Sequence, residues 1–350
     1  MSTTTQDDNR TFREKIRDVP SVKTQRIFAL IMLIAQGGIT FTGSLVRVTG
    51  SGLGCNTWPL CHEGSLFPVP GAAPWVQQVI EFGNRTLTFV VVATTILVFW
   101  AVMKAGRRNS IIVLSVLSGL GVVLQAVIGG ISVLLDLQWW SVAIHFLPSM
   151  LLVWIAAVLY MRIKEPDDVA PTERFSPATR SLVVVAAVAL CLVLVTGTMV
   201  TGSGPHSGDS GVGMEGRLAI DTQLLAYAHA ACMYIYLVFT LIAVYMLRRQ
   251  NAPKDAFNTA LVLVAMIVVQ WAIGVGQFYL GVPRWTVPMH IIMSSVVVAY
   301  SAFLYSHGSR RLPLLEPHQH NTLANRDALD SSSNPSDPSD PSDPSTAAAV

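Results

Sequence analysis

Three polar residues that could do chemistry lie at the start of a long apolar run. The stretch VIEFGNRTLTFVVV, residues 79–92, contains Glu81, Asn84 and Arg85. Their spacing of i, i+3 and i+4 would place them on one face of a helix. A buried charge is unfavourable unless it is paired, so two interpretations stay open. In the first, Glu81 and Arg85 form a structural ion pair, and Arg85 anchors the helix near the lipid headgroups. In the second, the carboxylate of Glu81 takes part in acid–base chemistry.

Three histidines also fall inside apolar runs: His145, His229 and His290. His229 and His290 follow Asn84 and His145, respectively, by the same 145 positions. One half of the sequence therefore has a histidine pair where the other has an asparagine and a histidine. Two imidazoles on facing helices at one depth are typical of haem sites in membrane bundles. Hydrogen bonding between helices is the alternative.

The composition indicates which elements must hold these residues. The chain has 350 residues, of which 52% are hydrophobic and 13% charged, and its mean hydropathy is +0.51. Soluble domains carry about 25% charged residues, so we expect an all-α polytopic membrane protein that binds no nucleic acid. Runs of about 20 apolar residues can span a bilayer. Eight such spans are predicted, at 25–47, 80–103, 110–135, 140–162, 180–201, 222–247, 257–280 and 285–306.

Lysine and arginine predict the orientation of the spans, because they concentrate in cytoplasmic segments. The N-terminal segment, the connections near 104–109, 162–180 and 248–254, and the segment after 306 are rich in these residues. Both termini are therefore expected in the cytoplasm. The connections expected outside are 48–79, 136–139, 202–221 and 281–284.

An internal repeat predicts the arrangement of the spans. Residues 124–149 align without gaps with residues 269–294, and the eight identities include Gln125/Gln270, Gly129/Gly274 and His145/His290. Each half has four spans, so both halves enter the membrane from the same side, as in a parallel repeat. We expect two four-helix bundles related by a pseudo-twofold axis. The predicted parts are an N-terminal cytoplasmic segment (1–24), a first bundle (25–163), a cytoplasmic linker (164–179), a second bundle (180–306) and a disordered cytoplasmic tail (307–350).

Two of the four cysteines, Cys55 and Cys61, share the first outer connection. The outside of a cell is oxidising, so a short-loop disulfide is one interpretation and two free thiols are the other.

At this point the sequence resembles the haem A synthase family. The resemblance covers about residues 25–306 and rests on three groups of motifs: TGSLVRVTGSGLGCNTWPLC (42–61) with EFGNR (81–85), QAVIGGISV (125–133) with His145, and TGSG (201–204) with His229, QWAIGVGQFYLG (270–281) and His290. It implies an enzyme of the cell membrane that oxidises the C8 methyl of haem O to a formyl group, giving haem A for terminal oxidase assembly.

The resemblance also implies roles for individual residues. His229 and His290 would hold a haem b cofactor by its iron, and His145 would contact the substrate haem O. Glu81 would be the essential carboxylate, and Cys55 would pair with Cys61. Arg85 and Arg47 are expected to contact haem propionates or Glu81.

One residue departs from the pattern of the family. Many members have Glu-x-x-His-Arg where this sequence has Glu81, Asn84 and Arg85. We therefore predict that His145 is the sole histidine on the substrate iron, with Asn84 lining the pocket. Other proteins that could contact this one are a haem O synthase and oxidase assembly proteins, and no motif identifies an electron donor or acceptor.

Two other functions remain open from the sequence. A dihaem b-type electron carrier would want four axial ligands, and this sequence supplies three. A transporter built on a parallel repeat would bind no haem.

Overall fold

The computed structural model describes residues 18–206 and 216–312. The predicted disordered tail (307–350) is wrong for residues 307–312, which are described and include the strand Ser309–Arg310. The rest of the tail and most of the N-terminal segment lie outside these ranges. The described chain contains helices α2 (Val22–Val48), α3 (Trp75–Lys104), α4 (Asn109–Leu134), α5 (Trp139–Ile163), α6 (Pro177–Ser203), α7 (Thr222–Arg249), α8 (Lys254–Tyr279) and α9 (Thr286–His307). All eight are long and apolar enough to cross a bilayer, which confirms the eight predicted spans to within five residues at each end.

Local sequence accounts for where several helices begin. The Ser21 hydroxyl accepts a hydrogen bond from the Thr24 N–H at the start of α2, and the Asp221 carboxylate accepts from the Leu224 N–H at the start of α7. Both are ordinary N-cap arrangements that satisfy backbone donors a helix leaves unpaired. Helix α6 begins with Pro177 after an N-cap serine, where the missing proline N–H does no harm.

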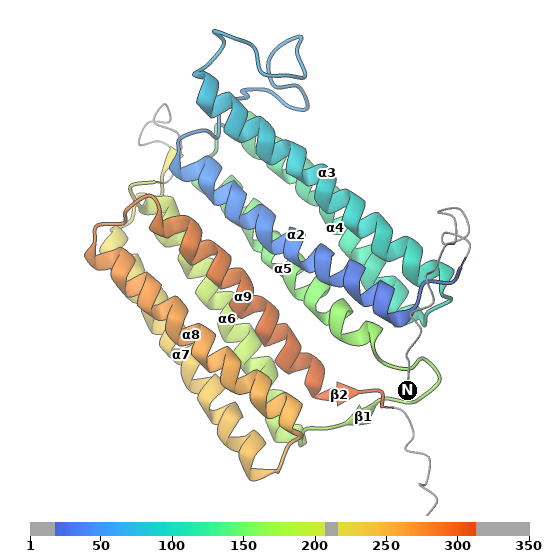
Figure 1. Cartoon of the computed structure of the whole chain (residues 1–350). Coiled ribbons are helices and arrows are strands. Elements are labelled where there is room, and N and C mark those ends of the chain that lie inside the picture. The colour runs from blue at the N-terminus through green and yellow to red at the C-terminus, as the bar shows by residue number, and fades with distance from the viewer. Residues whose placement is uncertain (1–17, 207–215, 313–350) are drawn as a thin grey trace, which may run out of the picture. The chain divides into compact units, whose positions relative to one another are not determined.

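The helices make contacts in two rings. In the first, α2, α3, α4 and α5 each contact the next, and α5 contacts α2. In the second, α6, α7, α8 and α9 do the same, and α9 contacts α6. The rings are joined where α2 contacts α9 and where α5 contacts both α9 and α6 (Figure 1). The cytoplasmic location of the termini stays a prediction.

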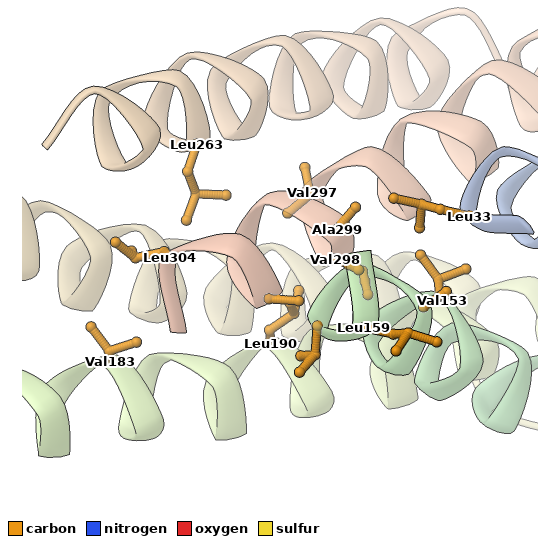
Figure 2. Close-up of a cluster of buried hydrophobic side chains, with 14 of the residues drawn as sticks. Leu33, Val153, Leu159, Val183, Leu190, Leu263, Val297, Val298, Ala299 and Leu304 are labelled. Atoms are coloured by element: carbon orange, nitrogen blue, oxygen red, sulfur yellow. The ribbon is translucent and has the colours of Figure 1, made fainter. Parts of the chain in front are cut away.

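The main apolar core follows the seam between the rings. Its fully buried side chains include Met32 of α2, Leu159 of α5 and Ala302 of α9. Figure 2 shows neighbouring members, such as Leu190 of α6, between the ribbons. A bilayer supplies no hydrophobic force between helices, so close packing of this kind must hold the halves together.

The end of the molecule rich in lysine and arginine contains the two short strands β1 (Thr172–Glu173) and β2 (Ser309–Arg310), which pair antiparallel. This pair was not predicted, since each strand has two residues and no sequence periodicity. The segment before β1 carries Glu165, whose buried carboxylate lies 2.7 Å from Arg108 and 3.0 Å from Arg162. The predicted linker is therefore tied to the first ring by ion pairs.

Candidate functional site

The chemically interesting residues gather at one end of the helices. Successive helices alternate in direction, so α3, α5, α7 and α9 begin at the same end (Figure 1). Asn84, His145, His229 and His290 each lie within roughly the first three turns of one of these helices. The long connection between α2 and α3 lies at this end too. The four positions related by the repeat are therefore at similar depth.

The structure brings His229 and His290 together. Their ring centres are 6.3 Å apart, and the ring planes meet at 65°. Metal–nitrogen bonds of about 2.0–2.1 Å put the centres of two imidazoles on opposite sides of one metal about 6 Å apart. Nδ1 of His229 lies 3.0 Å from the Val193 carbonyl. A carbonyl can only accept, so Nδ1 carries the proton and Nε2 keeps its lone pair for a metal.

Each of the three histidines lies against a glycine of the preceding helix. A methyl group on any of these glycines would come within 3.0–3.2 Å of the Cε1 atom of the ring, which is too close for comfortable packing. The pairs are Gly129 with His145, Gly197 with His229, and Gly274 with His290. Glycine at these positions lets the backbone of one helix approach the imidazole of the next.

His145 and His290 share a second property. The Nδ1 atom of each is buried and has no hydrogen-bond partner among the described residues. A hydrogen bond between helices lies near each of these two histidines. Gln125 accepts from Ser149 of α5 at 3.0 Å, and Gln270 donates to the His290 carbonyl at 3.1 Å. Each glutamine therefore joins its helix to the next one.

Asn84 occupies the fourth position and has a different environment. Its Oδ1 atom accepts a hydrogen bond of 2.7 Å from the Thr42 hydroxyl of α2. In the second ring, the Thr196 hydroxyl of α6 lies 3.2 Å from Nδ1 of His229. The two threonines thus make the same contact in the two halves, one to an amide and the other to an imidazole.

Glu81 and Arg85 form the ion pair that their spacing predicted. Nη2 of Arg85 lies 2.5 Å from Oε1 of Glu81 and Nε lies 3.1 Å from the same atom. Oε2 of Glu81 accepts a hydrogen bond of 2.7 Å from the Cys55 N–H. Only 4% of the surface of Glu81 is exposed. The carboxylate is buried, and both of its oxygens have donors.

Arg85 also holds the outer connection onto α3. Its two terminal nitrogens donate to the carbonyl oxygens of Cys55, Thr57 and Leu60 at 2.8–3.1 Å. The structure pairs Cys55 with Cys61, so these three carbonyls belong to one closed loop. The ion pair and the cysteine pair are one assembly, which the sequence did not predict.

Two further contacts fix this loop. Nε2 of His62 lies 2.8 Å from Oε1 of Gln78 in the first turn of α3. That oxygen also accepts from the Val69 N–H, and the Gln78 amide nitrogen donates to two carbonyls, so His62 must be the donor. The Trp58 indole lies against Gly130 of α4 and leaves no room for a side chain there. The loop therefore covers the end of the first ring.

Two further residues, Arg47 and Trp139, join the first ring to α6. Arg47 donates to the carbonyls of Thr201 and His206 at 3.1 and 2.6 Å, so it joins the first ring to the end of α6. A contact between Arg47 and a haem propionate stays a prediction. Trp139 lies against Gly202 of α6, which makes it a packing residue of the seam as well as a residue near the membrane boundary.

Sequence reasoning missed Thr42 and Thr196. A signal existed: both begin a Thr-Gly dipeptide shortly before the repeated VTGSG motif. The first-half segment TGSLVRVTGSG (42–52) is two residues longer than the second-half segment TGTMVTGSG (196–204), and Arg47 lies in the longer segment. An alignment without gaps therefore does not match Thr42 with Thr196. The contacts that Arg85 makes with backbone carbonyls left no signal, since any residue supplies a carbonyl.

The residues fit a haem better than a bare metal ion. No three histidine, cysteine, aspartate or glutamate side chains cluster in the described ranges 18–206 and 216–312. A haem needs only axial nitrogens, because the porphyrin supplies the other four ligands. The ring spacing of His229 and His290, the proton on Nδ1 of His229 and the glycines beside both rings all suit such a pair.

Known proteins resemble this chain over most of its length. The chain aligns with proteins named Heme A synthase. The protein from Listeria monocytogenes is 25% identical over 82% of this chain and 96% of its own length. The protein from Halalkalibacterium halodurans is 23% identical over 79% of this chain and 94% of its own length. The protein from Bacillus licheniformis is 30% identical over 44% of this chain and 50% of its own length. Residues 26–302 match the COX15-CtaA family, described as cytochrome oxidase assembly protein, and the chain belongs to this family.

Proposed function

We propose that this protein is a haem A synthase of the cell membrane, which oxidises the C8 methyl of haem O to a formyl group. Two successive hydroxylations of the methyl carbon, each a two-electron oxidation that requires an external oxidant, give a hydrated aldehyde, and loss of water gives the formyl group. The product is the haem required for terminal oxidase assembly. The proposal is supported by the family match over residues 26–302 and by the unequal chemistry of two halves built to one plan.

The second ring is the cofactor half in this proposal. His229 and His290 would hold haem b, with His229 prepared by its hydrogen bond to Val193. The bound haem would supply one-electron transfer. The protein supplies the two imidazoles, the glycines that admit the rings and a largely apolar setting.

The first ring is the substrate half. His145 would position the haem O ring, and Gly129 lets that imidazole lie close to α4. The observation that carries the proposal is the buried carboxylate of Glu81 at the same end of this ring, held by Arg85 and by the Cys55 N–H. The second half has Ala226 at the position equivalent to Glu81. Acid–base work is therefore assigned to one half only.

Glu81 would hold and move a proton near the reacting methyl. Arg85 and the Cys55 N–H fix its direction, because they hold different oxygens of the carboxylate. The loop closed by the disulfide of Cys55 and Cys61 places Trp58 over α4 and limits the entry of water. Exclusion of water strengthens the electrostatic effect of the ion pair on the substrate.

The test is chromatography of haems extracted from cells that make haem O, with and without this protein. Haem A or its hydroxylated precursor should appear only with the intact protein, and Glu81→Ala should abolish it. Phe89→Leu is the matched control on the same helix, since Phe89 is 74% exposed. If haem b co-purifies while haem O stays unchanged, the protein is an electron carrier and the proposal is wrong.

A further inference from the structure

The position of Asn84 has a consequence for the substrate half. In the second ring of helices, a methyl group built on Gly197 would lie 3.1 Å from Cε1 of His229. The corresponding glycine of the first ring is Gly43, which follows Thr42 as Gly197 follows Thr196. In the described part of the chain, no atom beyond the local helix lies within 4 Å of a methyl group built there. The space that an imidazole fills in one half is open in the other.

The hydrogen bond from Thr42 determines which end of the Asn84 amide is available. Thr42 has one hydroxyl proton and two acceptors in reach, Asn84 Oδ1 at 2.7 Å and the Ile39 carbonyl at 3.2 Å. The shorter contact takes the proton. The amide oxygen is thereby engaged, and its NH2 group has no hydrogen-bond partner among the described residues. Asn84 offers donors, and a donor cannot bind a metal.

We propose that the first half holds its haem by His145 alone and leaves the opposite side for a small exogenous ligand, which the NH2 group of Asn84 stabilises by hydrogen bonding. The ligand class is a diatomic molecule or small anion that binds haem iron and accepts a hydrogen bond. Thr42 is the positioning residue that fixes the amide. The proposal rests on the proposed function, because it requires a haem in the first half.

Exchanging the residue at this repeat position should have opposite effects on ligand binding in the two halves. Asn84→His should fill the open space with an imidazole and close the site. His229→Asn should remove one ligand of the cofactor half and open a site there. Because the two positions are equivalent in the repeat, each variant is the control for the other.

The experiment uses carbon monoxide as the probe on the purified, reduced protein with both haems present. Absorption spectra and titration give the number of carbon monoxide molecules bound for each protein, and the haem content is measured separately. The intact protein should bind about one, Asn84→His none and His229→Asn about two. Equal binding by the intact protein and Asn84→His would overturn the proposal, as would a first half that binds no haem or no carbon monoxide.

The role of the amide is tested by vibrational spectroscopy of the bound carbon monoxide. Asn84→Leu should keep binding but raise the C–O stretching frequency, because a hydrogen-bond donor is lost. Carbon monoxide should also leave about fivefold faster, as expected for one ordinary hydrogen bond. Thr42→Val should broaden the band, since the amide is no longer fixed. An unchanged band in Asn84→Leu would show that the NH2 group does not contact the ligand.

These results separate the inference from the proposed function. Carbon monoxide binding that follows the pattern above, in a protein that makes no haem A, would support the open site and reject the enzyme. Haem A production by a protein in which neither haem binds carbon monoxide would support the enzyme and reject the open site.

Discussion

The two halves of this protein share a scaffold and differ at a few positions that matter for chemistry. Both have a threonine that contacts the polar residue on the next helix, Thr42 in the first half and Thr196 in the second. The contacted residue is Asn84 in one and His229 in the other. The comparison teaches that a duplicated helical frame can be kept while one imidazole is exchanged for an amide.

The halves also differ in the cysteines of the connections between their first two helices. Over the first half, the loop closed by Cys55 and Cys61 is tied to α3 through Arg85. The connection between α6 and α7 has no cysteine. A closed loop over a buried carboxylate is the arrangement that the proposed reacting half requires.

The largest effect should come from removing a cofactor ligand. His290→Ala should release haem b almost completely, because changes at residues that only contact a metal ligand already lower metal affinity by roughly 10–100-fold. The measurement is the haem b content of the purified protein. His145→Ala is the matched change in the other half and should leave haem b in place. Equal loss of haem b from both variants would contradict the division of roles.

The second effect concerns the carboxylate that only the first half possesses. Glu81→Gln should lower haem A formation by about 10²–10⁴-fold, the range for loss of an acid–base group. It should also lower stability by about 2 kcal/mol, since Arg85 loses its partner but is partly exposed. Thermal unfolding separates the two consequences. A stability loss without a loss of product would make the ion pair purely structural.

Sequence predicted the helices well and the site only in part. Apolar runs specify spans directly, so the ends of α2 to α9 fell within five residues of prediction. The pair His229 and His290 followed from the repeat, and Glu81 with Arg85 followed from helical spacing. These are local or periodic signals.

The parts that escaped prediction depend on contacts between distant backbone and side-chain atoms. Arg85 binds carbonyls 25–30 residues away, and His62 meets Gln78 through a turn of the chain that no pattern encodes. The pair β1–β2 joins residues far apart in the sequence. Such contacts appear only when the chain has folded.

The third prediction uses the cysteines of the first half. Replacing Cys55 and Cys61 together by serine should lower the stability of the outer loop by about 2 kcal/mol, the lower end for a disulfide. Haem A formation should fall less than in Glu81→Gln, because Arg85 still binds the loop carbonyls. Proteolysis of the loop reports the loosening, and the haem b spectrum serves as the control. A changed haem b spectrum would mean that the loop also supports the second half.

Paired glycine substitutions give a smaller and more selective test. Gly197→Ala should disturb His229, since the new methyl group would lie 3.1 Å from Cε1, and should weaken haem b binding severalfold. Gly43→Ala has open space and should leave haem b binding unchanged. Haem titration of the two variants measures the difference. Equal effects would remove the evidence that Gly43 faces unfilled space.

The smallest effect is expected at the far end, where Asp167 of the linker pairs with Arg107 and Arg108 of the first half. Burial acts to raise the pKa of Asp167, but the hydrogen bond and charge of Arg107, with the charge of Arg108, hold this pKa below its usual value. A lowered folded-state pKa gives stability that is present above the unfolded pKa of about 4 and is lost as the pH falls through the folded pKa.

Asp167→Asn should therefore reduce stability by less than about 1 kcal/mol at neutral pH, since the side chain is 32% exposed. The difference from the intact protein should shrink as the pH falls below about 4, where the intact carboxylate also loses its charge. Thermal unfolding across pH measures this, with Asp168→Asn on the same exposed segment as the control. A deficit that persists unchanged at low pH would show that Asp167 stabilises the linker through packing and not through its charge.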